Sequence, residues 1–228
     1  MTVQALHETD DLQTQMQGVG ERARAAALAL AKADDAAKTA ALNAAAAALR
    51  RRAGELKQAN QADVDAAEGL SEAMVDRLKL TDDRIEGMAA GLETIAQLPD
   101  PVNATLAAWD RPNGLNIARV SVPIGVIGII YESRPNVTAD AGGLCLKSGN
   151  AAILRGGSES WHSAGVILDC LRDGLTAAGL PADALQRPPS ADRENVGHML
   201  AMADTIDLIV PRGGKGLIQR VMETSRVP

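Results

Sequence analysis

Ile124-Gly-Val-Ile-Gly-Ile-Ile130 is the stretch of sequence that decides the fold class of this chain. It is an uninterrupted apolar run rich in β-branched residues, and no charged side chain marks a solvent-exposed face. Such a run is typical of a strand that is buried on both faces, as in a parallel sheet covered by helices. We therefore expect residues 124–130 to form a central strand of such a sheet.

Strand and helix patterns alternate after this run. Strands are expected at residues 151–154, 184–187 and 207–210, and helices at residues 137–147, 159–178, 192–202 and from about 214. Strands separated by helical segments predict right-handed βαβ crossovers. The fold class is therefore α/β, with a Rossmann-like, mostly parallel sheet flanked by helices. Ahead of the run, residues 116–122 alternate apolar and polar side chains, which predicts a half-exposed strand.

The first part of the chain is expected to be helical. Leu42, Leu49 and Leu56 recur every seven residues, which places them on one packed face of a helical region. The many alanines around them allow neighbouring helices to approach closely. We therefore divide the chain into a helical N-terminal region, residues 1–113, and a Rossmann-like unit, residues 114–228.

Composition narrows the class of protein. The hydrophobic share of 46% and the charged share of 23% are ordinary for a globular chain of 228 residues. The net charge of −6 and the near absence of aromatic residues argue against a nucleic-acid partner. The longest apolar stretch, residues 122–131, is far shorter than the roughly 20 residues that span a membrane. With no signal-peptide pattern at its start, the chain is expected to be cytoplasmic and to have no membrane partner.

Three turns that follow expected strands carry the candidate ligand-binding residues, because ligands of parallel sheets bind where the strands end. The first turn, residues 131–138, gathers the carboxylate of Glu132, the guanidinium of Arg134 and the amide of Asn136. These groups could contact a small anionic substrate. A polar turn that merely caps the next helix is the alternative.

The second turn follows the strand at residues 151–154. Gly156 and Gly157 allow a close approach of the backbone, and Arg155 could bind a phosphate with two parallel hydrogen bonds. The helix that comes next offers free N–H groups and a positive dipole end to an anion. The alternative is a glycine turn beside a solvated arginine.

The third turn, residues 210–216, again joins a strand to a helix. Arg212 and Lys215 stand among three glycines, including Gly213 and Gly214, and this combination predicts a phosphate-binding turn. It is not a Walker A loop, because Gly216 follows the lysine where that motif has Ser or Thr. No G-x-G-x-x-G motif follows the first strand, so a dinucleotide would be bound in a different way.

Five segments carry a resemblance to a known family: residues 69–78, 121–138, 145–150, 153–157 and 209–214. Together they resemble the γ-glutamyl phosphate reductases, also called glutamate-5-semialdehyde dehydrogenases, of the aldehyde dehydrogenase superfamily. The similarity covers essentially the whole chain. It implies an NADPH-dependent reduction of γ-glutamyl phosphate in proline biosynthesis, by a protein that is expected to be a homo-oligomer.

The resemblance also implies roles for particular residues. It places the NADP(H) site in residues 114–228 and the ribose with its 2′-phosphate near Arg155. The residues expected to bind the cofactor are Arg155, Gly156, Gly157, Ser158, Glu159, Arg212, Gly213 and Gly214. Asn136 is a candidate donor to an oxyanion, and Arg134 is a candidate contact of the substrate.

Members of this family carry their nucleophilic cysteine in a catalytic domain that this chain is expected to lack. Cys145 and Cys170 do not match that nucleophile, and both are expected to be buried structural residues. His7, His162 and His198 show no metal-ligand or catalytic pattern and are expected to be surface or packing residues, so no metal site is predicted. The chain would then be the cofactor-binding half and would not catalyse the reaction alone.

Two alternatives stay open at this point. The chain could be a non-catalytic dinucleotide-binding or assembly module. It could also belong to a related dehydrogenase that acts on another aldehyde or acyl phosphate.

Overall fold

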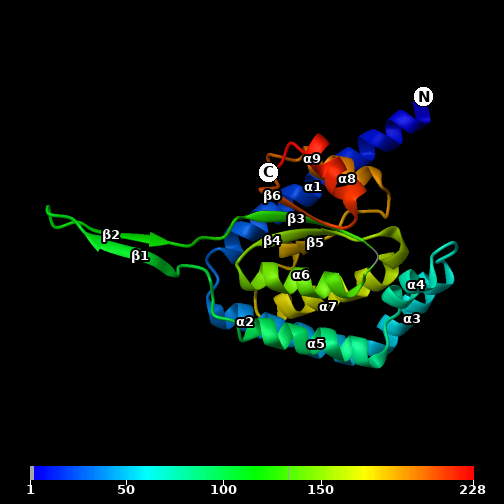
Figure 1. Cartoon of the computed structure of the whole chain (residues 1–228), viewed down its shortest axis with the longest axis horizontal. Coiled ribbons are helices and arrows are strands. Elements are labelled where there is room, and N and C mark those ends of the chain that lie inside the picture. Colours follow the sequence, from blue (N-terminus) through cyan, green and yellow to red (C-terminus); the bar gives the residue numbers. More distant parts are fainter. Residues whose placement is uncertain (1–2, 133) are drawn as a thin grey trace.

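A parallel sheet of four strands, in the order β5-β4-β3-β6, lies at the centre of the fold (Figure 1). The computed structural model describes the backbone of residues 3–132 and 134–228 and the side chains of residues 11–132 and 134–228. The strands are β3 (Val126–Tyr131), β4 (Ala151–Arg155), β5 (Leu185–Gln186) and β6 (Leu208–Arg212). All residues of β3 are buried and β3 lies between β4 and β6, which confirms the expectation of a central strand.

The period-two geometry of β3 divides its side chains between two hydrophobic cores. Ile127, Ile129 and Tyr131 belong to the larger core, while Val126 and Ile130 belong to the smaller core on the opposite face of the sheet. Both faces of the strand are therefore covered by apolar side chains, which explains why its sequence is apolar without interruption.

Helices supply the other side of each core (Figure 1). One face is covered by α6 and α7, which are in turn covered by α2 and α5; the other face is covered by α1 and α8. The helices are α1 (Val3–Leu30), α2 (Asp35–Arg51), α3 (Ala53–Asp65), α4 (Glu72–Leu78), α5 (Asp82–Ala96), α6 (Asn136–Lys147), α7 (Trp161–Ala177), α8 (Glu194–Ala201) and α9 (Lys215–Thr224). Two short 3-10 turns, η1 (Ser158–Ser160) and η2 (Ala182–Ala184), precede α7 and β5. Among the described residues, no helix is long and apolar enough to cross a membrane.

The expected strand at residues 116–122 is corrected by the structure. It forms β2 (Asn116–Val120), which pairs antiparallel with β1 (Thr105–Asp110) and does not join the parallel sheet. This hairpin extends away from the rest of the chain (Figure 1), so every residue of both strands is exposed where one buried face was expected. Residues 113 and 114 lie in its turn.

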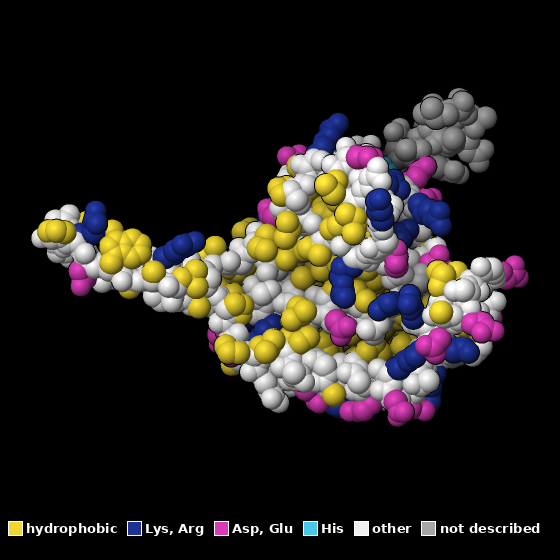
Figure 2. Space-filling view, viewed as in Figure 1, with side chains coloured by type: hydrophobic (Ala, Val, Ile, Leu, Met, Phe, Trp, Pro, Cys, Tyr) yellow, Lys and Arg dark blue, Asp and Glu magenta, His cyan; other side chains and the backbone are white. Residues whose placement is uncertain are grey.

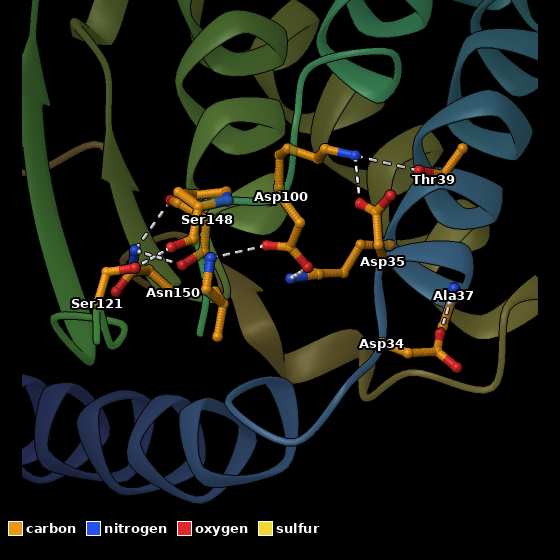
Figure 3. A network of polar contacts seen from close by, with 12 residues as sticks. Asp34, Asp35, Ala37, Thr39, Asp100, Ser121, Ser148 and Asn150 are labelled. Carbon is orange, nitrogen blue, oxygen red and sulfur yellow. Dashed lines mark hydrogen bonds and ion pairs between the residues drawn. The ribbon is translucent and has the colours of Figure 1, made fainter. Parts of the chain in front are cut away.

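Two buried lysines, Lys38 and Lys147, hold the segment that leads into the hairpin, and Figure 3 shows their acidic partners Asp100 and Asp35. Lys38 Nζ lies 2.6 Å from Asp100 Oδ2, just after the end of α5. Lys147 Nζ, at the end of α6, donates hydrogen bonds to Asp35 Oδ1 at 2.5 Å and to the carbonyl of Ala96 at 2.9 Å. Both lysines are at least 97% buried, so each needs a partner for its charge inside the protein. Their contacts connect α2, α5 and α6 at the base of the hairpin.

Candidate functional site

The turns that end β3 and β6 are in direct contact. Glu132, the first residue after β3, accepts a hydrogen bond from the backbone N–H of Gly214 at a distance of 2.6 Å. A Cβ atom at Gly213 would lie 2.8 Å from the same carboxylate oxygen, so a larger residue there would displace the Glu132 side chain. The first and third candidate turns therefore come together. However, the N-terminus of α9 already binds a carboxylate of the chain itself.

A cavity of about 410 Å³ opens at the carboxyl ends of β3 and β4. Its walls come from the turns after these strands and from α4, α8 and α9. The lining residues are Met74, Arg77, Ile130, Tyr131, Glu132, Arg134, Arg155, Gly157, Ser158, Glu159, Arg193, Val196, Leu217 and Arg220. We call this space the first cavity.

Arginines dominate the charge of the first cavity. Figure 2 shows dark-blue Lys and Arg side chains gathered between the surface formed by α8 and α9 and the surface formed by α4. Within the part of the chain that the structure describes, Arg77, Arg134, Arg193 and Arg220 form no ion pair. Their positive charge is therefore available to an anionic ligand.

Arg155 also lines the first cavity, but its guanidinium is engaged by the backbone. It donates to the carbonyls of Gly156 at 2.7 Å, Ala191 at 3.1 Å and Asp192 at 3.4 Å. The residue is only 8% exposed, and this burial lowers the pKa of its guanidinium. Arg155 therefore ties the end of β4 to the segment that precedes α8.

The two glycines of the second turn differ in role. A Cβ atom at Gly156 would lie 2.9 Å from the ring of Tyr131, so this glycine is required by packing inside the protein. The Tyr131 hydroxyl is hydrogen-bonded to Thr138 Oγ1 at 2.7 Å, and burial raises the pKa of this tyrosine to about 12. Gly157, in contrast, lines the first cavity together with Ser158 and Glu159.

The start of α7 is not the free anion site that the sequence predicted. The backbone N–H groups of His162 and Ser163 donate to the carboxylate of Asp63, at 3.0 Å and 2.8 Å. Asp63 lies on α3 and is buried, so an internal carboxylate already occupies this helix terminus. Beside it, the Arg187 guanidinium stacks 4.0 Å from the centre of the Trp161 ring.

A second cavity, of about 490 Å³, lies on the other side of the turn after β3. Asn136 and Arg134 both line it, and Arg134 also lines the first cavity. Asn136 Nδ2 donates a hydrogen bond to Asp140 Oδ2 at 3.2 Å. Arg212, Gly213 and Gly214 line a third space of about 560 Å³, which is also bordered by Arg134.

The cysteines and histidines lie away from these cavities. Cys145 and Cys170 are buried, and burial raises the pKa of their thiols to about 12 and about 11 respectively. His162 is exposed and His198 is partly exposed, while the side chain of His7 lies outside the described residues. No group of three or more His, Cys, Asp or Glu side chains among the described residues could hold a metal ion.

Six lining residues of the first cavity (Met74, Arg77, Arg193, Val196, Leu217 and Arg220) were not singled out from the sequence, because they lie on or next to helices and not in the turns that directly follow strands. Met74 and Arg77 belong to α4, in the segment 69–78 whose motif contributed to the resemblance. Arg193 directly precedes α8 and Arg220 lies in the second turn of α9. A helix-face analysis of 215–224 would have placed Leu217 and Arg220 on one side.

Comparison with known proteins identifies the family. A sequence model described as the aldehyde dehydrogenase family matches residues 7–227. The chain belongs to the aldehyde dehydrogenase family. It is 62% identical over 222 residues to the γ-glutamyl phosphate reductase of Rhodospirillum rubrum, a match that covers 96% of this chain and 52% of that protein. The chain therefore spans about half the length of the curated relatives it matches.

Solved structures agree with this placement in the aldehyde dehydrogenase family. The γ-glutamyl phosphate reductase of Thermotoga maritima superposes with a TM-score of 0.92 at 40% identity, covering 94% of this chain and 52% of that one. The γ-glutamyl phosphate reductase of Saccharomyces cerevisiae gives a TM-score of 0.86 at 32% identity, covering 93% of this chain and 55% of that one. The resemblance inferred from the five segments is confirmed, and the chain corresponds to the N-terminal half of these reductases.

Proposed function

We propose that this chain is the NADP(H)-binding half of an enzyme that reduces γ-glutamyl phosphate to glutamate 5-semialdehyde and phosphate. The observation that carries the proposal is the identity of 62% to a γ-glutamyl phosphate reductase across 96% of the chain. The arginine-lined cavity at the ends of β3 and β4 supports it, because open parallel sheets bind nucleotides at this position.

The chemistry of the first cavity suits a phosphorylated dinucleotide. Ile130, Val196 and Leu217 offer apolar surface to a flat base, while Arg193 and Arg220 offer cations to phosphate groups. Ser158 and Glu159 supply hydrogen-bonding groups that suit ribose hydroxyls. NADPH, when bound, supplies the hydride, and the protein supplies its orientation.

Within this proposal, Arg155 has an indirect role in binding the 2′-phosphate. Its hydrogen bonds to the carbonyls of Ala191 and Asp192 hold the segment that presents Arg193 to the cavity. Gly157 leaves room for the ribose, and Arg212, Gly213 and Gly214 border the neighbouring space where the rest of the dinucleotide extends.

On the substrate side, Asn136 keeps one N–H free of its bond to Asp140 and can donate to an oxyanion. Arg134 borders all three spaces and can contact the reacting acyl phosphate. The hairpin exposes Leu106, Trp109 and Ile117, which supports our proposal that the protein is a homo-oligomer.

The experiment is a phosphate-dependence assay on the full-length enzyme that carries this chain. Glutamate 5-semialdehyde, NADP⁺ and inorganic phosphate are mixed, and formation of NADPH is followed. We expect NADPH to form only when phosphate is present, since the reverse reaction consumes it. Oxidation that does not need phosphate would identify an ordinary aldehyde dehydrogenase instead. Tight NADPH binding without turnover would favour a binding module.

A further inference from the structure

The second cavity has a lining of mixed charge that the binding of a dinucleotide does not use. Its walls are the C-terminal part of α4, the N-terminal half of α5, the turn after β3 and the first turns of α6. The lining residues are Arg77, Lys79, Leu80, Arg84, Gly87, Met88, Arg134, Asn136 and Asp140. Arg77 and Arg134 line both cavities, so the second cavity adjoins the first at the end of β3.

Lys79 is held at the wall of the second cavity by a buried amide. Asn60, which is 4% exposed, donates through Nδ2 to the carbonyl of Leu78 at 2.8 Å and accepts from the N–H of Leu80 at 2.7 Å. Both leucines are buried, so the residue between them must point outward. These two hydrogen bonds therefore fix the backbone around Lys79, whose exposed side chain lines the second cavity.

Arg84 completes this wall but is not available to a ligand. Its guanidinium pairs with Asp76 Oδ2 at 3.0 Å and donates to the carbonyl of Lys79 at 2.9 Å. Arg77 and Lys79 form no ion pair among the residues that the structure describes. The C-terminal end of α4 and the residue that follows it thus present two cations that have no ion-pair partner among the described residues.

The opposite wall carries one acidic group. Asp140 lies on α6, and one of its carboxylate oxygens is oriented by Asn136 Nδ2 at 3.2 Å. Its side chain is partly buried, and this burial raises the pKa of the carboxyl group. A cationic ligand group would restore the favourable interactions that the carboxylate loses by leaving water.

We propose that the second cavity binds the amino-acid head of the substrate, with its α-carboxylate on Arg77 and Lys79 and its α-ammonium on Asp140. This inference rests on the proposed function, which gives the substrate a zwitterionic head at one end and an acyl phosphate at the other. A phosphate group alone would suit the two cations but not Asp140. Arg134, at the junction of the two cavities, is then left for the reacting end.

The test compares two aldehydes on the full-length enzyme that carries this chain. Glutamate 5-semialdehyde has the α-amino group, and 5-oxopentanoate lacks it. In Asp140→Asn, kcat/KM for glutamate 5-semialdehyde should fall about 10- to 100-fold, the effect of a lost charge-assisted hydrogen bond. The kcat/KM for 5-oxopentanoate should change less than about threefold. Asp173→Asn, on the exposed surface of α7, is the matched control and should change neither value.

A second variant tests the cavity without changing any charged group. Apart from the backbone of its own helix, no atom lies within 4 Å of the position that a Cβ at Gly87 would take, so the side chain of Gly87→Leu has room to enter the cavity. It should raise KM for both aldehydes and leave KM for NADP⁺ unchanged.

The outcomes separate this inference from the proposed function. A parent enzyme that does not oxidise glutamate 5-semialdehyde with phosphate and NADP⁺ overturns the proposed function and the inference together. An active parent whose Asp140→Asn variant loses the same factor for both aldehydes overturns the inference alone. So does a Gly87→Leu variant with unchanged KM for both.

Discussion

Substitution of Arg155 tests how the site is built. In the proposed function, Arg155 has a structural role, through its hydrogen bonds to backbone carbonyls, and the other arginines of the first cavity have a role in binding the ligand. Arg155→Met keeps the aliphatic stem and removes the donors to the carbonyls of Gly156, Ala191 and Asp192. A hydrogen bond to a charged group contributes about 1.5–3 kcal/mol, and only the bonds at 2.7 and 3.1 Å have good lengths. Counting these two at the lower value gives a loss of about 3 kcal/mol.

Two measurements on the chain check this value. Urea unfolding should show the loss of about 3 kcal/mol, and the melting temperature should fall by about 6–12 °C for a chain of this size. The affinity for NADPH should fall together with the stability, because the segment that presents Arg193 is no longer held. Arg193→Met, an exposed residue, should change stability by less than about 0.5 kcal/mol. It should weaken NADPH about 10- to 100-fold and NADH much less.

The reasoning would be refuted by the opposite pattern. If Arg155→Met unfolds like the parent chain and loses NADPH selectively, Arg155 reads the 2′-phosphate directly and its backbone contacts contribute nothing.

Three further predictions concern stability and reactivity. Gly125 has a φ of +127°, and a Cβ there would overlap the carboxylate of Asp207. Gly125→Ala should therefore lower the free energy of unfolding in urea by about 3 kcal/mol or more. A loss below about 1 kcal/mol would show that this turn adapts to the substitution. Burial alone would raise the pKa of Asp207, but hydrogen bonds from Arg24 and the backbone outweigh it and lower that pKa below its usual value. The stability that this carboxylate contributes is therefore complete above about pH 4 and lost as the pH falls through the lowered pKa; unfolding curves between pH 3 and 6 that do not shift in midpoint would contradict this. Burial raises the thiol pKa values of Cys145 and Cys170 to about 12 and about 11. Both thiols should therefore react with a disulfide reagent at pH 8 much more slowly in the folded chain than in urea. Equal rates in the two states would mean that one of the thiols is accessible in the folded chain.

The buried strands of the parallel sheet could be predicted from local sequence, because a strand that is covered on both faces has an uninterrupted apolar sequence. The apolar run at 124–130 and the shorter run that became β4 are of this kind, whereas β6 is an edge strand that is only partly buried. Thr105–Asp110 could not be recognised as a strand because its centre contains two alanines and every side chain is exposed. Pairing with Asn116–Val120, not a buried face, makes it a strand.

Part of the candidate site could also be predicted from local sequence. Residues that directly follow a strand, such as Arg134 and Gly157, could be placed near the ligand from the topology alone. Partners that come from distant elements could not. Nothing local indicates that Asp63 occupies the N-terminus of α7, that Glu132 binds Gly214, or that Arg77 reaches the first cavity from α4. Such contacts depend on how the helices pack against the sheet.

The most direct test of the central claim is a calorimetric titration of the 228-residue chain with NADPH and with NADH, after circular dichroism has verified its fold. The account predicts one saturable site, with NADPH bound at least about tenfold more tightly than NADH because arginines in the first cavity contact the 2′-phosphate. The preference should shrink as salt is added. A folded chain that binds neither nucleotide, or binds both with the same affinity at every salt concentration, would contradict the claim that this chain is an NADP(H)-binding unit.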